Sequence, residues 1–214
     1  MLAWGRIRAQ IVSMPELNAP TLRTPRLRLE TIAPRRAAAL ADFHFRNGER
    51  LRRWSPPAPP APTGPTDAGY WLAKAAEHEA ERRAGRALRW LLFRHEASDV
   101  LVGTASLTGI ERGPFQSGRL GYQIDGACEG RGLMQEALQA VIAHAFDELR
   151  LHRLEANHLP ENERSARLLA RLGFERIGVA PSYLFIDGAW RDHVLNQLLS
   201  SRADPVEFGR TLVA

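Results

Sequence analysis

Apolar residues recur at spacings of three and four along residues 132–149, and this period predicts an amphipathic helix. Three further segments combine a helical pattern with capping or stop residues, namely residues 34–47, 67–85 and 162–172. Gly48 and Gly173 are expected to end the first and the last of these helices. Asp67 is expected to cap the second one.

The remaining apolar positions follow strand patterns. Residues 26–30 alternate between polar and apolar, while residues 89–94 and 100–107 flank a polar turn at 96–99 and predict a β-hairpin. Further strands are expected at residues 119–124, 153–158, 174–179 and 183–199, the last broken by a turn at Asp187-Gly188. The order of these elements indicates a mixed α/β fold, with a central sheet of about seven strands flanked by about four helices.

The length of 214 residues and the hydrophobic content of 44% fit one packed domain and exclude global disorder. We expect this domain at residues 21–199, after an N-terminal extension at 1–20 and before a tail at 200–214. Residues 54–65 contain six prolines and are expected to form a loop. The sequence leaves open whether the native chain starts at Met1 or at Met14.

Composition excludes several classes of site. Cys128 is the only cysteine, which rules out an intrachain disulfide and a cysteine-rich zinc site. The seven histidines show no metal-ligand spacing, so no metal is expected. No apolar run reaches the ~18–20 residues that a membrane span requires, and residues 1–20 do not have the pattern of a secretory signal. We therefore expect a protein of the reducing cytoplasm that does not enter a membrane.

The formal net charge is +5, and Lys74 is the only lysine among 29 basic residues. Arginine binds phosphate groups bidentately, so this surface suits a phosphate-bearing partner. A coding bias toward arginine is the alternative explanation. Charge alone does not separate a nucleotide ligand from ribosomal RNA, and we expect no sequence-specific binding of nucleic acid.

The glycines at 130 and 132 join a predicted strand to the strongest predicted helix. Glycine allows a ligand to approach the backbone closely, and the start of a helix presents unpaired N–H groups with a partial positive charge, which favours a pyrophosphate. Three interpretations compete. In the first interpretation, the glycines form only a tight turn. In the second, they belong to a dinucleotide-binding motif, but Gln135 stands where that motif has its third glycine. The third interpretation is the Q/R-x-x-G-x-G/A turn of acetyl-CoA-dependent N-acetyltransferases.

A second motif, Asn162-x-x-Ser165 followed by Gly173-Phe174, comes after this turn in the order N-x-x-S…GF. With both motifs, the chain resembles the GNAT superfamily of N-acetyltransferases. Residues 183–195 and the segment Thr24-Pro25-Arg26-Leu27 resemble its RimJ branch, the ribosomal-protein-alanine N-acetyltransferases. The resemblance covers about residues 21–199.

The chain departs from the superfamily pattern at two positions of the turn. Glu129 stands where the superfamily has Gln or Arg, and an acid there would repel a pyrophosphate unless its side chain points away. Met134 replaces a small residue, as it does in the RimJ branch. The proline-rich loop lies where family members shape the peptide entrance, so these departures concern substrate choice more than the cosubstrate.

The resemblance implies a GNAT fold and acetyl-CoA as cosubstrate. The pyrophosphate would be held by consecutive backbone N–H groups, those of Gly130, Arg131, Gly132, Leu133, Met134 and Gln135. Ile124 would pair with the pantetheine arm, Asn162 would hydrogen-bond the pantetheine or acyl region, and Ser165 would lie near the thiol sulfur.

The same resemblance suggests catalytic and substrate residues. Ser165 would stabilise or protonate the departing thiolate, with Tyr183 as an alternative acid or a simple core tyrosine. Tyr122 and Asn157 lie on strands expected to diverge around the acetyl group. Glu155 shares a face with Asn157, so it either faces the amine or pairs with a surface arginine.

The implied reaction is acetylation of the N-terminal alanine of a ribosomal protein, by direct attack of the neutral amine on the thioester. The implied partners are that ribosomal protein N-terminus and the ribosome or its assembly intermediates. Two alternatives remain open because fold does not determine function. One is acetylation of a small amine such as a polyamine, an aminoglycoside or an amino acid, and the other is a ribosome-assembly factor that only binds.

Overall fold

The structure is a computed structural model that describes residues 17, 20–58 and 62–201. The expectations for Met14 and for residues 202–214 lie outside these residues. Leu17 is buried in the core and its backbone N–H donates to the Arg82 carbonyl. Packing therefore extends N-terminal to the boundary expected at residue 21.

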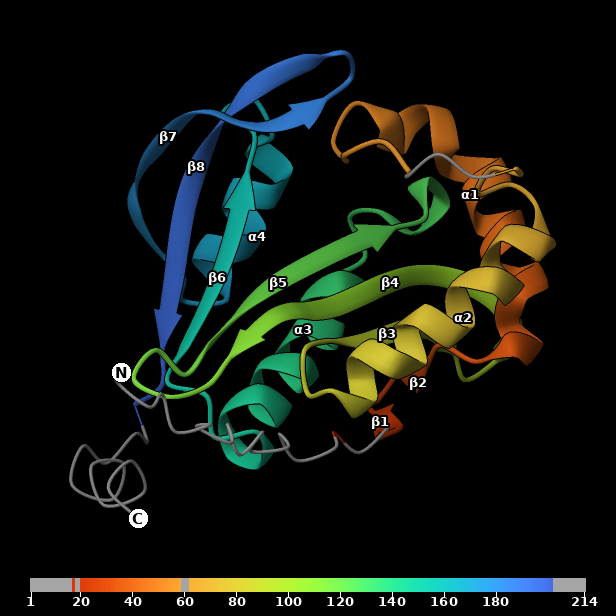
Figure 1. The fold of residues 1–214 in the computed structure, drawn as a ribbon, viewed down its shortest axis with the longest axis horizontal. Coiled ribbons are helices and arrows are strands. Elements are labelled where there is room, and N and C mark those ends of the chain that lie inside the picture. Colours follow the sequence, from red (N-terminus) through yellow and green to blue (C-terminus); the bar gives the residue numbers. More distant parts are fainter. Residues whose placement is uncertain (1–16, 18–19, 59–61, 202–214) are drawn as a thin grey trace, which may run out of the picture.

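Within the described residues, eight strands form one mixed sheet in the order β1-β2-β3-β4-β5-β6-β8-β7, which confirms the predicted α/β class (Figure 1). The strands are β1 (Leu22–Arg23), β2 (Leu27–Thr31), β3 (Leu88–Arg94), β4 (Ala97–Glu111), β5 (Ser117–Ile124), β6 (Arg153–His158), β7 (Glu175–Ile186) and β8 (Ala189–Leu199). The eighth strand is the two-residue β1, which pairs with β2 and is too short to give a sequence pattern.

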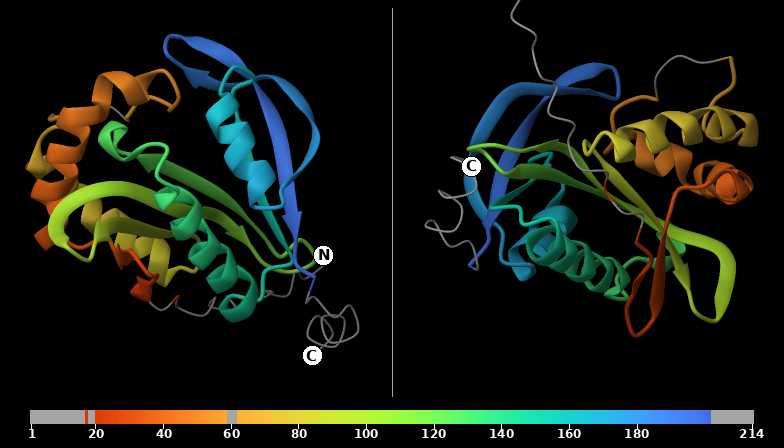
Figure 2. Two further views of the ribbon diagram at one scale, coloured as in Figure 1. Left: turned by 180° about the vertical axis from the view of Figure 1, so that it is seen from behind. Right: turned by 60° about the horizontal axis from the view of Figure 1, so that its bottom comes forward.

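In the part of the chain that the structure describes, four α-helices cover the two faces of the sheet (Figure 2). Helices α1 (Ala37–Arg52) and α2 (Ala68–Arg83) lie on one face, and α3 (Leu133–Ala143) and α4 (Glu163–Arg171) lie on the other. The larger hydrophobic core includes Trp90, Leu107 and Leu138 and packs the sheet against α3. A smaller core, which includes Phe43 and Phe93, packs α1 against β3 and β4.

The prediction that Gly48 ends the first helix is wrong, since α1 continues to Arg52. Leu40, Phe43 and Leu51 are all buried on the face that packs against the sheet. A glycine in a helix interior costs only about 1 kcal/mol relative to alanine, and burial of Leu51 beyond it outweighs that cost. The start also differs, because residues Pro34–Arg36 form a 3₁₀ turn before the α-helix begins.

Other boundaries differ from the predictions in more local ways. A break was expected between residues 179 and 183, but β7 is one continuous strand. At this place its pairing with β8 is irregular, and Ser182 has a φ of 47°. β4 begins and ends several residues outside the predicted range. Helix α3 is followed by a π-helical segment, His144–Glu148, that fills the rest of the predicted helix. The turn at Asp187-Gly188 joins Ile186 to Ala189 as predicted, with positive φ at both turn residues.

The sheet opens between β5 and β6. These parallel strands pair only between Ser117–Arg119 and Arg153–Glu155, near their N-terminal ends. β5 instead remains paired with β4 as far as Ile124, so its C-terminal half diverges from β6 (Figure 1). The expected divergence of the strands that carry Tyr122 and Asn157 is therefore present.

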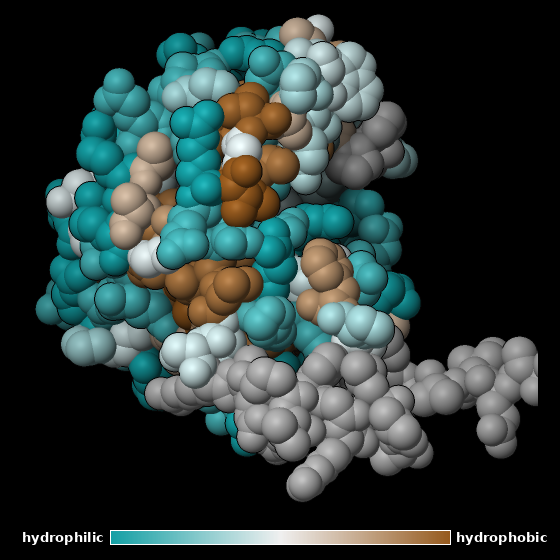
Figure 3. All heavy atoms as spheres, turned by 90° about the vertical axis from the view of Figure 1, so that its left-hand side faces the viewer, coloured by the Kyte–Doolittle hydropathy of each residue, from teal (hydrophilic) through white to brown (hydrophobic). Residues whose placement is uncertain are grey.

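Strands β7 and β8 expose apolar side chains on one side of the molecule, where Figure 3 shows patches of hydrophobic surface. The exposed large apolar residues of these strands include Ile177, Val179 and Leu199. Among the helices that the structure describes, none is both long and apolar enough to cross a membrane.

Candidate functional site

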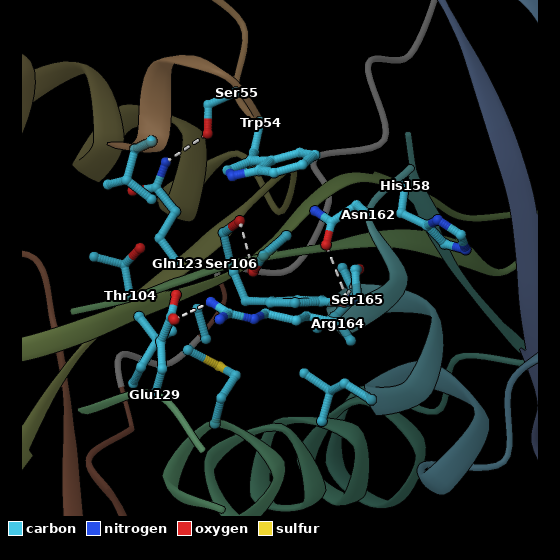
Figure 4. Close-up of a pocket in the computed structure, with 18 of the residues that line it drawn as sticks. Trp54, Ser55, Thr104, Ser106, Gln123, Glu129, His158, Asn162, Arg164 and Ser165 are labelled. Carbon is cyan, nitrogen blue, oxygen red and sulfur yellow. Dashed lines mark hydrogen bonds and ion pairs between the residues drawn. The ribbon is translucent and has the colours of Figure 1, made fainter. Parts of the chain in front are cut away.

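A cavity of about 1420 Å³ occupies the opening between β5 and β6 (Figure 4). At one end it reaches the Gly130 turn and α4, and at the other it reaches Trp54 and Ser55 after α1. It is lined by residues from both faces of the sheet, because the diverging strands leave a passage between those faces. Two ligands can therefore approach the gap from opposite sides.

The glycine turn is shaped for close approach to the backbone. Gly130 and Gly132 have φ values of 72° and 73°, a region that L side chains rarely adopt, and a Cβ at Gly130 would meet no atom within 4 Å. Gly132 is the N-cap of α3 and provides no side-chain cap. The N–H groups of the first helical turn therefore have no acceptor within the helix, which makes this end suitable for an anion.

The side chains around the turn divide into those that pack inside and those that face solvent. Leu133 and Met134 are largely buried in the larger core, and both residues also line the cavity. Arg131 is exposed, and its carbonyl accepts a hydrogen bond from Arg26. Gln135 lines the cavity and accepts a hydrogen bond from Arg171 of α4 at 3.1 Å.

Glu129 does not leave an uncompensated negative charge at the turn. One carboxylate oxygen accepts a hydrogen bond from Arg50 of α1 at 2.7 Å, and the other accepts one from Arg164 of α4 (Figure 4). Arg50 also donates to the carbonyl of Ile124. The expected repulsion of a pyrophosphate is therefore offset by two guanidinium groups.

Asn162 and Ser165 lie together at the start of α4. The Asn162 side chain is the N-cap and accepts a hydrogen bond from the Ser165 backbone N–H at 3.1 Å. The Ser165 hydroxyl lies 2.6 Å from the hydroxyl of Tyr122 on β5. Burial raises the pKa of Tyr122 above its ordinary value, although the hydrogen bond with Ser165 acts in the opposite direction. A pair of protonated hydroxyl groups thus bridges the open part of the sheet.

The remaining predicted residues lie around the β6 side of the cavity. Asn157 lines it and donates a hydrogen bond to the Tyr183 hydroxyl at 3.3 Å. Tyr183 itself does not line the cavity. Its ring packs against that of His193, which does line it. Glu155 is also absent from the lining, and its carboxylate accepts a hydrogen bond from Arg153 at 3.0 Å. Glu155 therefore pairs with an arginine in this structure and does not face the cavity.

Several lining residues carried no signal in the sequence. Ser55 accepts a hydrogen bond from Gln123 at 3.0 Å beside the Trp54 ring, at the start of the proline-rich loop (Figure 4). His44 stacks on Trp71, and burial lowers the pKa of His44 to about 4. These side chains come from α1, α2 and the loop between them, so their proximity to β5 depends on tertiary packing.

Among the described residues, no group of three or more His, Cys, Asp or Glu side chains could hold a metal ion. The one cysteine, Cys128, lines the cavity as a free thiol. The side chains that line the cavity include hydroxyls, amides, arginines, histidines and carboxylates.

Comparison with known proteins gives consistent matches. Residues 26–175 match the family model described as an acetyltransferase (GNAT) domain. The chain is 38% identical over 183 residues to the ribosomal protein uS5-alanine N-acetyltransferase of Escherichia coli (strain K12), which covers 85% of this chain and 92% of the relative.

Two solved structures share this fold over most of the chain. The ribosomal-protein-S5-alanine acetyltransferase from Vibrio fischeri has a TM-score of 0.80 at 29% identity, over 87% of this chain and 100% of that one. RimJ from Mycobacterium smegmatis, in complex with CoA-disulfide, has a TM-score of 0.76 at 28% identity, over 91% of this chain and 92% of that one.

Proposed function

The chain belongs to the GNAT acetyltransferase family, and from this premise we propose that it acetylates the N-terminal alanine of a ribosomal protein, with acetyl-CoA as the acetyl donor. The observation that carries the proposal is the continuous cavity that joins the glycine turn to the groove beside Trp54 and Gln123. Donor and acceptor would meet where β5 and β6 diverge. The relative of 38% identity, named for uS5 alanine, supports this choice of acceptor.

The turn fits the pyrophosphate of acetyl-CoA. The N–H groups of residues 130–135 would bind it, and the partial positive charge at the start of α3 would favour it. Arg164 and Arg50 compensate the charge of Glu129 beside the turn. Asn162 and Ile124 lie along the cavity toward the gap, on the path expected for the pantetheine arm.

In the proposed reaction the amine nitrogen forms a bond to the acetyl carbon, the C–S bond breaks, the amine loses a proton and the thiolate gains one. Ser165 would donate the proton to the thiolate, and Tyr122 would hold the Ser165 hydroxyl in place. This phenol is protonated at neutral pH, because the ordinary pKa of tyrosine is about 10 and burial raises that of Tyr122 further. Tyr183, whose hydroxyl accepts a hydrogen bond from the cavity residue Asn157, is the alternative acid.

The attacking amine needs little help from a base if it is a peptide α-amine. The pKa of such an amine is about 7.7–8.0, so roughly a tenth of it is neutral at pH 7, compared with roughly one lysine side chain in a few thousand. This difference favours an N-terminal amine as the acceptor.

The test is acetyl-CoA turnover, followed by thiol release, against a panel of amines. The panel contains peptides with N-terminal alanine or serine, the same peptides with blocked α-amines, spermidine and an aminoglycoside. We expect turnover of the free alanine peptide and none of its blocked form. Turnover of only the small amines would contradict the proposed acceptor, and acetyl-CoA binding without any turnover would favour a factor that only binds.

A further inference from the structure

The segment Thr24-Pro25-Arg26-Leu27 has no part in the proposed reaction, yet its polar groups contact the start of α3. Oε1 of Glu136 accepts hydrogen bonds from the Thr24 hydroxyl at 2.5 Å and from the Arg26 backbone N–H at 2.8 Å. Its Oε2 accepts one from Nε of Arg26 at 2.6 Å. Glu136 thus joins the entry to β2 to the first turn of α3, and we call these three residues the Glu136 clamp.

The clamp also holds the glycine turn. Nη1 of Arg26 donates to the Arg131 carbonyl at 2.9 Å. The C=O and the N–H of a trans peptide point to opposite sides, so this bond directs the Gly132 N–H away from Arg26. The Glu136 backbone N–H donates to the Gly132 carbonyl at 3.1 Å. Both peptide units of Gly132 are therefore fixed by residues of the clamp.

The charges of the clamp suit a site for an anion. Burial raises the pKa of Glu136, but the hydrogen bonds from Thr24 and Arg26 outweigh it, so the pKa lies below its ordinary value and the carboxylate is charged at neutral pH. The Glu136 side chain is 15% exposed and that of Arg26 is 50% exposed. Arg26 thus cancels a negative charge near the turn.

We propose that Arg26 is a positioning residue for pyrophosphate binding. Held by Glu136, it fixes the peptide between Arg131 and Gly132, so that the N–H groups of the turn are already oriented when acetyl-CoA binds. This inference rests on the proposed function. Preorganisation reduces the ordering cost of binding, so loss of Arg26 weakens the binding of CoA and leaves the chemical step unchanged.

The test compares two acetyl donors in the Arg26→Gln variant. Acetyl-CoA contains the pyrophosphate and S-acetyl-pantetheine does not. We expect CoA to bind about tenfold more weakly and kcat/KM for acetyl-CoA to fall by a similar factor. The value of kcat at saturating acetyl-CoA, and kcat/KM for S-acetyl-pantetheine, should stay within about twofold of wild type.

Two variants control for stability and charge. Arg94→Gln removes a similar arginine from the neighbouring strand, where Arg94 pairs with Glu96 and lies opposite Leu27 without contacting the turn. It should leave CoA binding unchanged. Arg26→Lys keeps the positive charge with fewer hydrogen-bond donors, so its CoA affinity should lie between those of wild type and Arg26→Gln. If Arg26→Gln does not fold, Arg26→Lys takes its place in the test.

Two results would overturn the inference while leaving the proposed function intact. One is unchanged CoA affinity in Arg26→Gln, and the other is an equal loss with S-acetyl-pantetheine, which would indicate general damage to the fold. A wild-type protein that does not bind CoA would overturn the proposed function and the inference with it.

Discussion

The hydroxyl pair of Ser165 and Tyr122 gives the clearest prediction for single residues. If Ser165 protonates the leaving thiolate, Ser165→Ala should lower kcat about a hundredfold and leave the KM for acetyl-CoA nearly unchanged. Tyr122→Phe keeps the ring and removes the hydroxyl, so its effect should be smaller. Because the two hydroxyls lie 2.6 Å apart, their effects should not be independent. The factor by which kcat falls in the double variant should therefore be smaller than the product of the factors in the two single variants. A kcat for Ser165→Ala close to wild type would contradict this assignment and direct attention to Tyr183.

Glu129 gives a second prediction, which concerns charge. Glu129→Gln removes a negative charge beside the turn and leaves Arg50 and Arg164 in place. We expect the KM for acetyl-CoA to fall roughly threefold at low ionic strength, since such partly exposed charges contribute up to about 1 kcal/mol. At high salt, the gain should shrink through screening. A higher KM would mean that Glu129 is needed to position the two arginines.

At the residue scale, the sequence predicts the turn better than its surroundings. Gly130 and Gly132 could be assigned because a positive φ and a helix start impose a visible requirement on residue type. The partners of Glu129 could not be assigned, since Arg50 is 79 residues away and one arginine in a helix resembles any other. Glu155 differs, because Arg153 stands two positions before it on the same predicted strand and shares its face, so this arginine partner was visible in the strand pattern.

At the scale of the element, two glycines of opposite character give a third prediction. Gly48 lies inside α1, and a Cβ at this position would meet no atom within 4 Å, so Gly48→Ala should stabilise the protein by about 0.5–1 kcal/mol. Gly132 has a φ of 73°, so Gly132→Ala should destabilise it by about 1–2 kcal/mol. Denaturant unfolding of both variants measures the two changes. Destabilisation by Gly48→Ala would mean that α1 does end near this residue.

The elements also show where sequence patterns stop being informative. Periodicity locates the four helices and seven of the strands because each buries one face. It fails at Gly48, since the burial of Leu51 in tertiary contacts overrides a local stop signal. It also misses the irregular pairing at Ser182, where the strand continues through a single residue of positive φ. The divergence of β5 from β6 depends on the pairing of β5 with β4 and was accessible only through the family resemblance.

For the whole molecule, the packing of α1 and α2 on the sheet links stability to pH. Burial lowers the pKa of His44 to about 4, and burial together with Arg89 lowers that of His78 to about 4. Nδ1 of His78 is buried without a hydrogen-bond partner. In the unfolded chain both groups have a pKa near 6.5, so the unfolded state binds more protons between pH 6.5 and 4. The free energy of unfolding should therefore fall as the pH decreases through this range.

This fourth prediction can be measured as the thermal midpoint at about pH 7.5 and at about pH 5, on either side of the ordinary histidine pKa. Carboxylates contribute little between these values, because their ordinary pKa is about 4.5 and those of Glu30 and Glu136 are lower still. We expect a clear decrease of the midpoint at the lower pH and a smaller decrease in His44→Leu, which removes one of the histidines whose pKa is lowered by burial. An equal decrease in wild type and variant would show that His44 does not couple the packing of α1 to pH. The same decrease would then have to arise from His78, or from His144, whose pKa burial also lowers.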